Sequence, residues 1–217
     1  MSIKGIVEAS CPAGCESFEV EVWSFIHGAK SPALREAALV KECNLLICPG
    51  CGAPFFAEAP YIYFDPDAEI LMFVFPDSFR REEARWRLKM GEDHLALKRA
   101  LGKNLPVDLA PELCFGPEGL SALLRDDDCR DEEREVMEFL ARDLGLSVYR
   151  ISPRFARRRG LPAALPYAPA PGEAVTRASL IDGLRRLLAA NDRLTTYQAC
   201  LDGLLASADA ALPPART

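Results

Sequence analysis

Two short cysteine clusters carry the clearest chemistry in this 217-residue chain. Cys11 and Cys15 enclose Pro-Ala-Gly, and Cys48 and Cys51 enclose Pro-Gly. Each turn directs two thiols toward one point, and two such turns can complete a tetrahedral site of four thiolates. The sequence therefore predicts one Zn²⁺ ion held by Cys11, Cys15, Cys48 and Cys51. Because four protein ligands leave no position for water, this metal is expected to organise the fold and not to catalyse a reaction.

The same residues leave two alternatives open. Cys43 could replace Cys15 as the fourth ligand, although an ordinary half-buried thiol is the favoured interpretation of Cys43. Cys-x-x-Cys pairs also occur in thiol–disulfide enzymes, so a redox- or metal-sensing thiol protein is the alternative function. The Gly-Ala-Pro-Phe-Phe segment after Cys51 is not the helix start that lowers a thiol pKa in those enzymes, which disfavours redox catalysis. The other three cysteines are expected in apolar or helical surroundings: Cys114, Cys129 and Cys200.

Neither histidine pairs with a serine or cysteine in a pattern typical of catalysis. His27 is expected at the end of a strand, near the surface or beside the ligands, and His94 within a charged helix. The sequence therefore offers no positive indication of an enzyme.

The charge distribution is uneven. The net charge is −6, and residues 1–77 contain 4 Lys or Arg against 11 Asp or Glu. Such an acidic segment repels phosphate, so nucleic-acid binding is the least favoured function. The only basic cluster comprises Arg154 and residues 157–159, for which a solvated surface or an intramolecular contact is favoured. With no apolar run that could span a bilayer and no signal-like start, we expect a cytoplasmic protein with reduced thiols.

The elements around the cysteine turns are mainly strands. Alternating apolar residues predict a strand over residues 17–25, and the cap-like Ser-Pro start predicts a helix over 31–40. Residues 44–47 and 54–58 lead into and out of the second cysteine turn. A hairpin is expected from 61–64 to 70–75, with the continuous apolar second arm buried on both faces.

The rest of the chain is mainly helical. Helices are predicted over residues 79–101, 117–124 and 131–144, with the acidic run at 126–131 favouring the helix start that follows. Four prolines between residues 161 and 172 predict a semi-rigid linker or surface arm. The leucine pattern after residue 173 fits one long helix, but a hairpin that breaks at Asn191-Asp192 is favoured.

With the strands placed, the chain resembles the bacterial CpXC domain family, named after a repeated Cys-Pro-x-Cys motif. The similar segments are Cys48 to Gly52, the strand at residues 18–23, the hairpin at 61–76, Phe-Gly-Pro-Glu-Gly-Leu at 115–120, and the acidic run before a Glu-rich helix. The resemblance covers roughly residues 8–142 and implies a zinc-ribbon-like module without a known reaction. The chain departs from the family where three residues separate Cys11 from Cys15, which moves the left-handed glycine position to Gly14.

These observations predict an α+β protein with a zinc-ribbon-like antiparallel sheet and packed helices. We expect a CpXC-like zinc-binding domain over residues 1–145, an Arg- and Pro-rich linker over 146–172 and a helical tail over 173–217. The expected role is a non-enzymatic module for protein–protein interaction or regulatory assembly. The partner is unknown, and self-association through the leucine stripe of the tail is one possibility.

Overall fold

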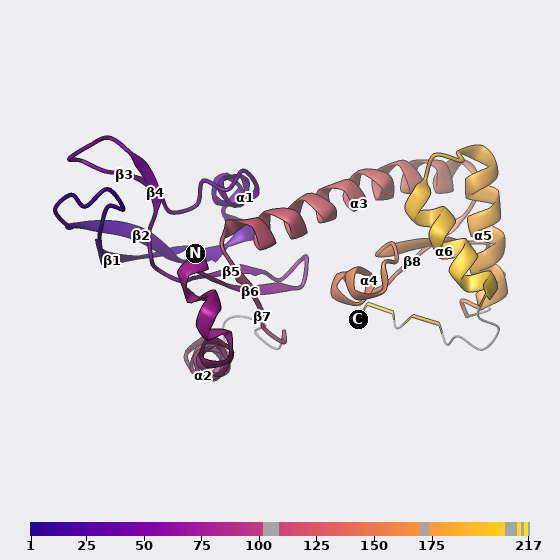
Figure 1. The fold of residues 1–217 in the computed structure, drawn as a ribbon. Helices are drawn as coiled ribbons and strands as arrows, with labels where there is room; N and C mark the ends of the chain where they lie inside the picture. Colours follow the sequence, from indigo (N-terminus) through magenta and orange to yellow (C-terminus); the bar gives the residue numbers. More distant parts are fainter. Residues whose placement is uncertain (102–108, 170–173, 207–211, 214, 217) are drawn as a thin grey trace. The chain divides into compact units, whose positions relative to one another are not determined.

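The computed structural model describes residues 1–101, 109–169, 174–206, 212–213 and 215–216 (Figure 1). Its α+β content agrees with the sequence prediction. The chain divides into two compact units, Met1–Arg125 and Asp126–Thr217. In the described part of the chain, no helix is long and apolar enough to cross a membrane.

The first unit is built on a five-stranded sheet with the order β1-β2-β5-β6-β7. Its strands are β1 (Ile3–Ala9), β2 (Phe18–His27), β5 (Tyr61–Asp65), β6 (Ile70–Phe75) and β7 (Glu112–Phe115). The β5–β6 hairpin is antiparallel, as the sequence predicted. The sheet as a whole is mixed and not antiparallel, because β2 pairs parallel with β5 and β6 pairs parallel with β7. The long connections between these strands bring the chain back in the same direction. Sequence reasoning missed β1, which is mostly exposed, and β7, which has only four residues.

Helices cover both faces of this sheet. On one face, α1 (Pro32–Leu39) and the start of α3 (Pro117–Asp143) pack against a cluster that includes Tyr63, Met72 and Leu120. On the other face, an aromatic cluster that includes Phe73 and Phe75 packs against α2 (Glu83–Leu101). All six residues of β6 are buried, which confirms that its apolar run is enclosed on both sides. Two short 3₁₀ helices, η1 (Gly28–Lys30) and η2 (Asp77–Glu82), precede α1 and α2.

A separate two-stranded ribbon lies beside the sheet. It pairs β3 (Leu45–Ile47) antiparallel with β4 (Pro54–Phe56). Asn44, immediately before β3, adopts a φ of 58°. Its side-chain amide accepts a hydrogen bond from the Trp23 backbone N–H and donates one to the Trp23 carbonyl, each 2.8 Å long. Asparagine tolerates this left-handed conformation better than most residues, so one side chain attaches the ribbon to β2.

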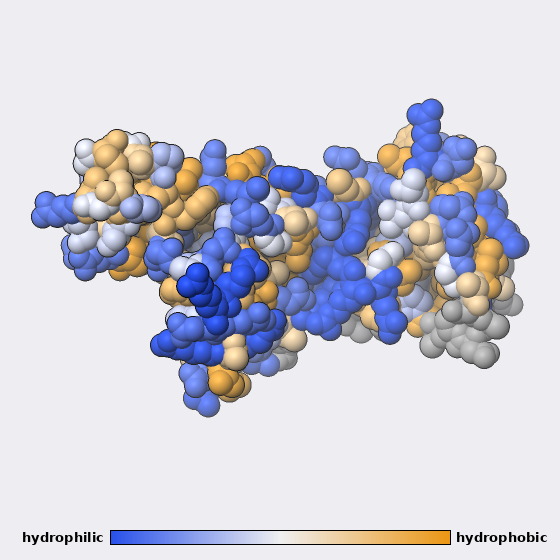
Figure 2. Space-filling model, in the orientation of Figure 1, coloured by the Kyte–Doolittle hydropathy of each residue, from blue (hydrophilic) through white to orange (hydrophobic). Residues whose placement is uncertain are grey.

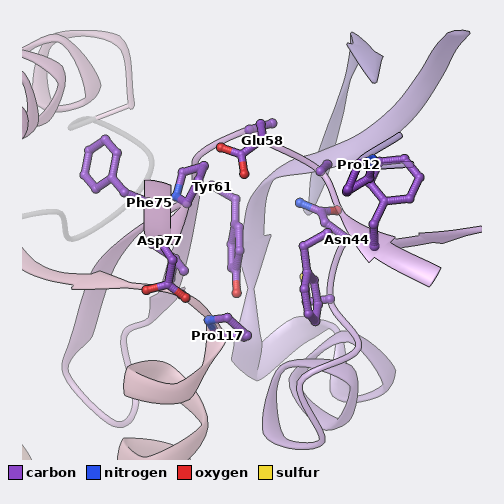
Figure 3. A pocket seen from close by; sticks show the side chains of 15 residues that line it. Pro12, Asn44, Glu58, Tyr61, Phe75, Asp77 and Pro117 are labelled. Carbon is purple, nitrogen blue, oxygen red and sulfur yellow. The ribbon is translucent and has the colours of Figure 1, made fainter. Parts of the chain in front are cut away.

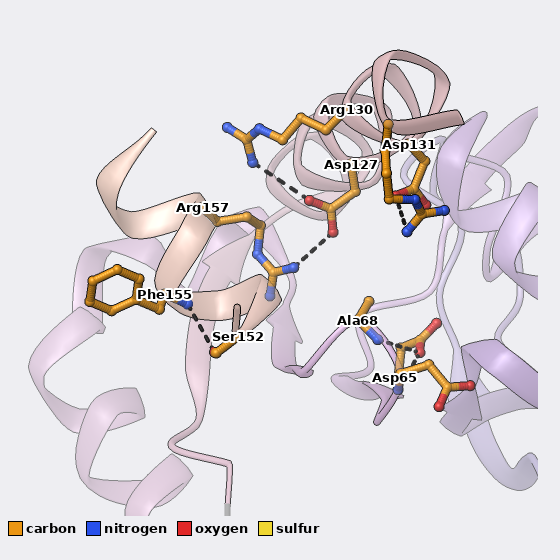
Figure 4. Close-up of polar contacts among 10 residues, drawn as sticks. Asp65, Ala68, Asp127, Arg130, Asp131, Ser152, Phe155 and Arg157 are labelled. Atoms are coloured by element: carbon orange, nitrogen blue, oxygen red, sulfur yellow. Dashed lines mark hydrogen bonds and ion pairs between the residues drawn. The ribbon is translucent and has the colours of Figure 1, made fainter. Parts of the chain in front are cut away.

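Helix α3 is one continuous helix, although the sequence predicted two. The acidic run lies inside it and not at a helix start, so the helix dipole does not explain the run. Figure 4 shows the ion pairs that the run makes within the second unit. The Asp127 carboxylate lies 2.9 Å from the Arg157 guanidinium and 3.6 Å from that of Arg130. Asp131 pairs with Arg134 one turn further along. These arginines balance the charge of aspartates that are otherwise weak helix formers.

The segment that the sequence predicted as a linker forms regular structure within the second unit. It contains β8 (Ser147–Arg150), α4 (Pro153–Arg159) and β9 (Ala164–Tyr167), and β8 pairs antiparallel with β9. Ala164 and Leu165 are each only 1% exposed, so this segment is part of a core and not a surface arm. The prolines are accommodated because a two-stranded sheet has only edge strands. Residues 170–173, at the end of the expected linker, lie outside the described residues.

The tail forms two helices, in agreement with the favoured hairpin. They are α5 (Arg177–Ala190) and α6 (Thr195–Ala206), and the break falls at Asn191 to Leu194. Leu180, Leu184 and Leu187 are fully buried against α3 and β9 residues of the same unit. These three leucines of the stripe that suggested self-association therefore pack within the unit itself, whereas Leu205 of the same stripe is 49% exposed. Residues 207–211, 214 and 217 of the predicted tail lie outside the described residues.

Candidate metal centre

The two cysteine turns are placed by two pairs of antiparallel strands. Cys11 and Cys15 lie in the connection between β1 and β2, and Cys48 and Cys51 lie in the connection between β3 and β4. In each pair the strands bring both ends of the turn together, so the turns can face each other at one end of the unit. The described part of the chain contains one group of potential metal ligands of this kind, and it comprises these four cysteines.

The sulfur geometry fits one tetrahedral metal ion. All four Sγ atoms lie within 4.8 Å of one another, and the Sγ atoms of Cys11 and Cys51 are 3.7 Å apart. A tetrahedron with metal–sulfur bonds of about 2.3 Å, the length typical of zinc, has sulfur–sulfur edges of about 3.8 Å. A disulfide requires about 2.05 Å, and all eight cysteines, each of which is described, are free thiols. The donor set and its spacing therefore fit a metal and not a cross-link.

Glycines allow both turns to close. Gly14 has a φ of 79° and Gly52 a φ of 74°, a region that residues with a Cβ rarely adopt. The Gly14 N–H donates to the Cys11 carbonyl at 3.0 Å, and the Gly52 N–H donates to the Cys48 carbonyl at 2.8 Å. Gly14 therefore takes the left-handed position in the first turn, as the three-residue spacing predicted. The longer turn still brings Cys15 into the sulfur cluster.

Backbone amides and burial set the protonation of the thiols. Backbone N–H groups of Cys51 and Gly50 lower the pKa of Cys48 to about 7, although burial opposes them. The neighbouring Cys51 and Cys48 thiols raise the pKa of Cys15 to about 12. The pKa of Cys11 is also raised, and the Ala13 N–H, 3.4 Å from its sulfur, opposes that increase. Without a metal, the cluster thus holds several protons, because like charges at this distance repel. A cation would displace them.

Cys43 lies outside this group. It is 4% exposed, belongs to the cluster between the sheet and α1, and has a pKa raised to about 12 by burial. Among the alternatives that the sequence left open, the structure therefore groups Cys15, and not Cys43, with the other three sulfurs. Cys114 and Cys200 are half-buried and buried respectively, as expected, whereas Cys129 is exposed on α3.

His27 is not at the surface and is not beside the sulfurs. It is 2% exposed at the far end of β2, where its ring packs edge-on against Phe64 at 5.3 Å between centroids. The ten residues of β2 separate it from the cysteine turn, a distance of about 30 Å at the usual rise of a strand. Burial lowers its pKa, which is typical of a neutral core histidine. His94 is half-buried on α2.

Comparison with known proteins identifies the family. No curated protein and no solved structure gives a match. The sequence profile of the CpXC protein family matches residues 9–120. The match begins just before the first cysteine turn and ends in the first turn of α3, so it is shorter than the expected 8–142. It covers more than half of the chain, and it includes all four cysteines of the cluster. The chain belongs to the CpXC family.

Proposed function

We propose that the first unit is a non-enzymatic interaction module that a structural zinc ion holds together. The sulfur cluster carries the proposal, because four cysteines within 4.8 Å supply a complete ligand set and leave no position for a reacting water. Cys11 and Cys48 are buried, Cys15 is half-buried and Cys51 is exposed, as expected for a metal between two turns near a surface.

An exposed apolar surface supports the interaction role. One face of the ribbon consists of two cross-strand pairs, Leu45 with Phe56 and Ile47 with Pro54, which we call the ribbon face. Leu45 is 38% exposed, Ile47 62% and Phe56 43%. Figure 2 shows hydrophobic residues gathered over the part of the unit where the ribbon lies. The opposite face, with Phe55 and Leu46, already packs around the cysteine centre. An exposed cluster of this kind is typical of an interaction site.

The zinc proposal is tested by the metal content of the purified full chain. We expect one zinc per chain in native mass spectrometry, and its loss in a Cys48→Ser variant. A Cys129→Ser variant is the matched control, since that thiol lies on α3 and outside the cluster. Zinc-free wild-type chain whose ribbon, residues 44–57, keeps its protection from hydrogen exchange would overturn a structural role for the metal.

The interaction proposal is tested with the ribbon face. We expect the double variant Leu45→Asp/Ile47→Asp to lose proteins that the wild-type chain captures from its native extract. Leu88→Asp/Leu95→Asp is the control, because these α2 leucines are 74% and 55% exposed but lie elsewhere in the unit. Quantitative mass spectrometry compares the three captured sets. Identical sets for the wild-type chain and the ribbon variant would contradict the interaction role.

A redox or metal sensor is the second candidate, supported by two observations. Cys51 is exposed, and the pKa of Cys48 is lowered to about 7, so one thiol is accessible and another ionises readily. In such a sensor, hydrogen peroxide would take two electrons from a pair of zinc-bound thiolates and two protons from solvent, which yields a disulfide, two waters and free zinc. Micromolar peroxide that releases zinc with concurrent disulfide formation supports the sensor. Zinc that resists this treatment supports the structural module.

A further inference from the structure

A pocket of about 260 Å³ lies next to the cysteine centre, within the first unit. Figure 3 shows its walls, which come from four parts of the unit. Pro12 belongs to the first cysteine turn, Phe56 to β4, Tyr61 to β5 and Pro117 to the start of α3. A wall made from segments this far apart in sequence exists only when the ribbon is folded against the sheet.

The size and lining suit one aromatic ring. Since each water in the liquid occupies about 30 Å³, the pocket has room for roughly nine non-hydrogen atoms. Phe55, Phe56, Tyr61 and Phe75 supply aromatic surface, and prolines supply flat apolar surface at both ends. A ligand ring that packs against these side chains gains binding energy from aromatic contacts in addition to the energy of burying its apolar surface. A drug-sized ligand would need a larger cavity.

Tyr61 contributes its ring to the pocket, whereas its hydroxyl is buried. The residue is 6% exposed, and the hydroxyl lies next to the Cys43 thiol, with which it shares a hydrogen bond. Burial raises its pKa, with smaller contributions from the thiols of Cys43 and Cys114. A thiol is only a weak hydrogen-bond partner. Figure 3 shows the Tyr61 ring across the middle of the pocket, with the hydroxyl directed toward Pro117. The hydroxyl is therefore not available to a ligand, and the pocket offers a ligand the aromatic and apolar surface of its lining.

Two carboxylates at the pocket favour a cation beside that ring. Glu58 and Asp77 are both exposed and both line the pocket, and Figure 3 shows them at opposite ends of it. Glu58 accepts a hydrogen bond from Ser78, and Asp77 lies 2.8 Å from the Arg80 guanidinium, which balances one of the two charges. The surrounding segment is strongly acidic, with 4 Lys or Arg against 11 Asp or Glu over residues 1–77. This field attracts basic partners.

We propose that the pocket binds an aromatic side chain that a partner protein presents between basic residues. The ring would lie between Phe56 and Tyr61, and the flanking cations would lie near Glu58 and Asp77. Phe56 lines the pocket and also belongs to the ribbon face, so the anchor and the apolar surface are continuous. This inference rests on the proposed interaction function and names the chemistry of its partner.

Short peptides test the proposal on the zinc-loaded full chain. The probe is acetyl-Gly-Lys-Tyr-Lys-Gly-amide, and its dissociation constant is measured by ¹⁵N NMR titration. We expect it to bind at least about tenfold more tightly than the same peptide with Glu in place of both Lys, or with Ala in place of Tyr. Equal affinity of the three peptides would overturn the proposal. Free tyramine that binds as tightly as the peptide would overturn the role of a partner segment.

A filled pocket separates this inference from the broader interaction role. Ala59 lines the pocket and is half-buried, so Ala59→Leu should fill it and abolish peptide binding. Ala96→Leu, on the exposed side of α2, is the matched control and should bind normally. If Ala59→Leu still captures the partners that Leu45→Asp/Ile47→Asp loses, the interaction role stands and the pocket is not its anchor.

Discussion

Removing the metal should unfold the ribbon and leave the five-stranded sheet folded. The reason is the small core around the cysteine centre. It contains four buried residues, Ala9, Cys11, Cys48 and Phe55, whereas the sheet is enclosed by two larger clusters that contain none of the four ligands. A two-stranded ribbon with three residues in each strand is not stable alone in water.

The magnitudes support this separation. Ordering residues 44–57 costs roughly 20 kcal/mol at about 1.5 kcal/mol per residue. Burial of Phe55 and partial burial of Leu46 contribute about 4 kcal/mol. The hydrogen bonds between Asn44 and Trp23, together with the backbone hydrogen bonds of the ribbon and its cysteine turn, add about 5–7 kcal/mol at about 1 kcal/mol each. The shortfall of about 10 kcal/mol is within the 10–16 kcal/mol or so that zinc supplies to small zinc-finger peptides.

Hydrogen exchange with mass spectrometry measures the outcome on the full chain, before and after an excess of EDTA at pH 7. We expect peptides from residues 44–57 to lose protection by several orders of magnitude, and peptides from β6 (residues 70–75) to change little. The Cys51→Ser variant should behave as the EDTA-treated protein does, and Cys129→Ser should behave as the untreated one does. Unchanged exchange rates in the ribbon would contradict the estimated shortfall in its stability. Exchange in β6 as fast as in the ribbon would contradict the independence of the sheet.

Three further predictions concern protons and packing. The pKa of Cys15 is raised to about 12 and that of Cys11 is also raised, so both thiols are protonated at pH 7. Zinc binding should therefore release at least two protons, and the affinity for zinc should rise with pH. Calorimetry in buffers of different ionisation enthalpy measures the number of protons released, and fewer than two would contradict the protonation of these two thiols. A Cβ at Gly28 would overlap a tyrosine hydroxyl on β5, so Gly28→Ala should lower the free energy of unfolding by about 1–3 kcal/mol. Gly203 has open space around it in α6, so Gly203→Ala should raise the free energy of unfolding by about 0.5–1 kcal/mol. Thermal unfolding compares the two variants, and equal shifts in melting temperature would contradict the close packing at Gly28. The buried hydroxyl of Tyr197 makes no hydrogen bond among the described residues, so Tyr197→Phe should leave thermal stability unchanged or raise it by up to about 1 kcal/mol, and a clear loss would reveal a partner.

The sequence predicted the parts of the fold that depend on local pattern. The cysteine spacing predicted which four residues meet, and the apolar run at residues 70–75 predicted a strand enclosed on both faces. The Asn191-Asp192 break predicted the helical hairpin. In each case neighbouring residues contain the information, since turn chemistry and periodicity act over a few positions.

The parts that were missed depend on contacts between distant segments. The parallel pairing of β2 with β5 results from a long connection that no local pattern describes. Proline content correctly excluded a helix over residues 164–167, but it could not show that Leu165 is buried beneath α5 as an edge strand. Within its acidic run, helix α3 pairs Asp127 with Arg157, thirty residues later, and no local pattern indicates that partner. The pocket also escaped prediction, because its lining comes from four parts of the unit.

The cysteine centre and the pocket share the ribbon, although no sulfur of the four-cysteine cluster lines the pocket. Phe55 and Phe56 belong to β4, and Asn44 holds the ribbon to β2, so all three depend on the ribbon fold that a bound zinc would stabilise. Loss of the metal should therefore abolish binding of the aromatic peptide even though the peptide never touches the metal. This coupling also relates the two candidate functions. A zinc ion that resists peroxide makes the pocket permanent, whereas one that peroxide releases would make binding of the partner depend on the oxidation of Cys48 and Cys51. The same peptide titration, repeated after peroxide treatment, distinguishes the structural module, which still binds the peptide, from the sensor, which no longer does.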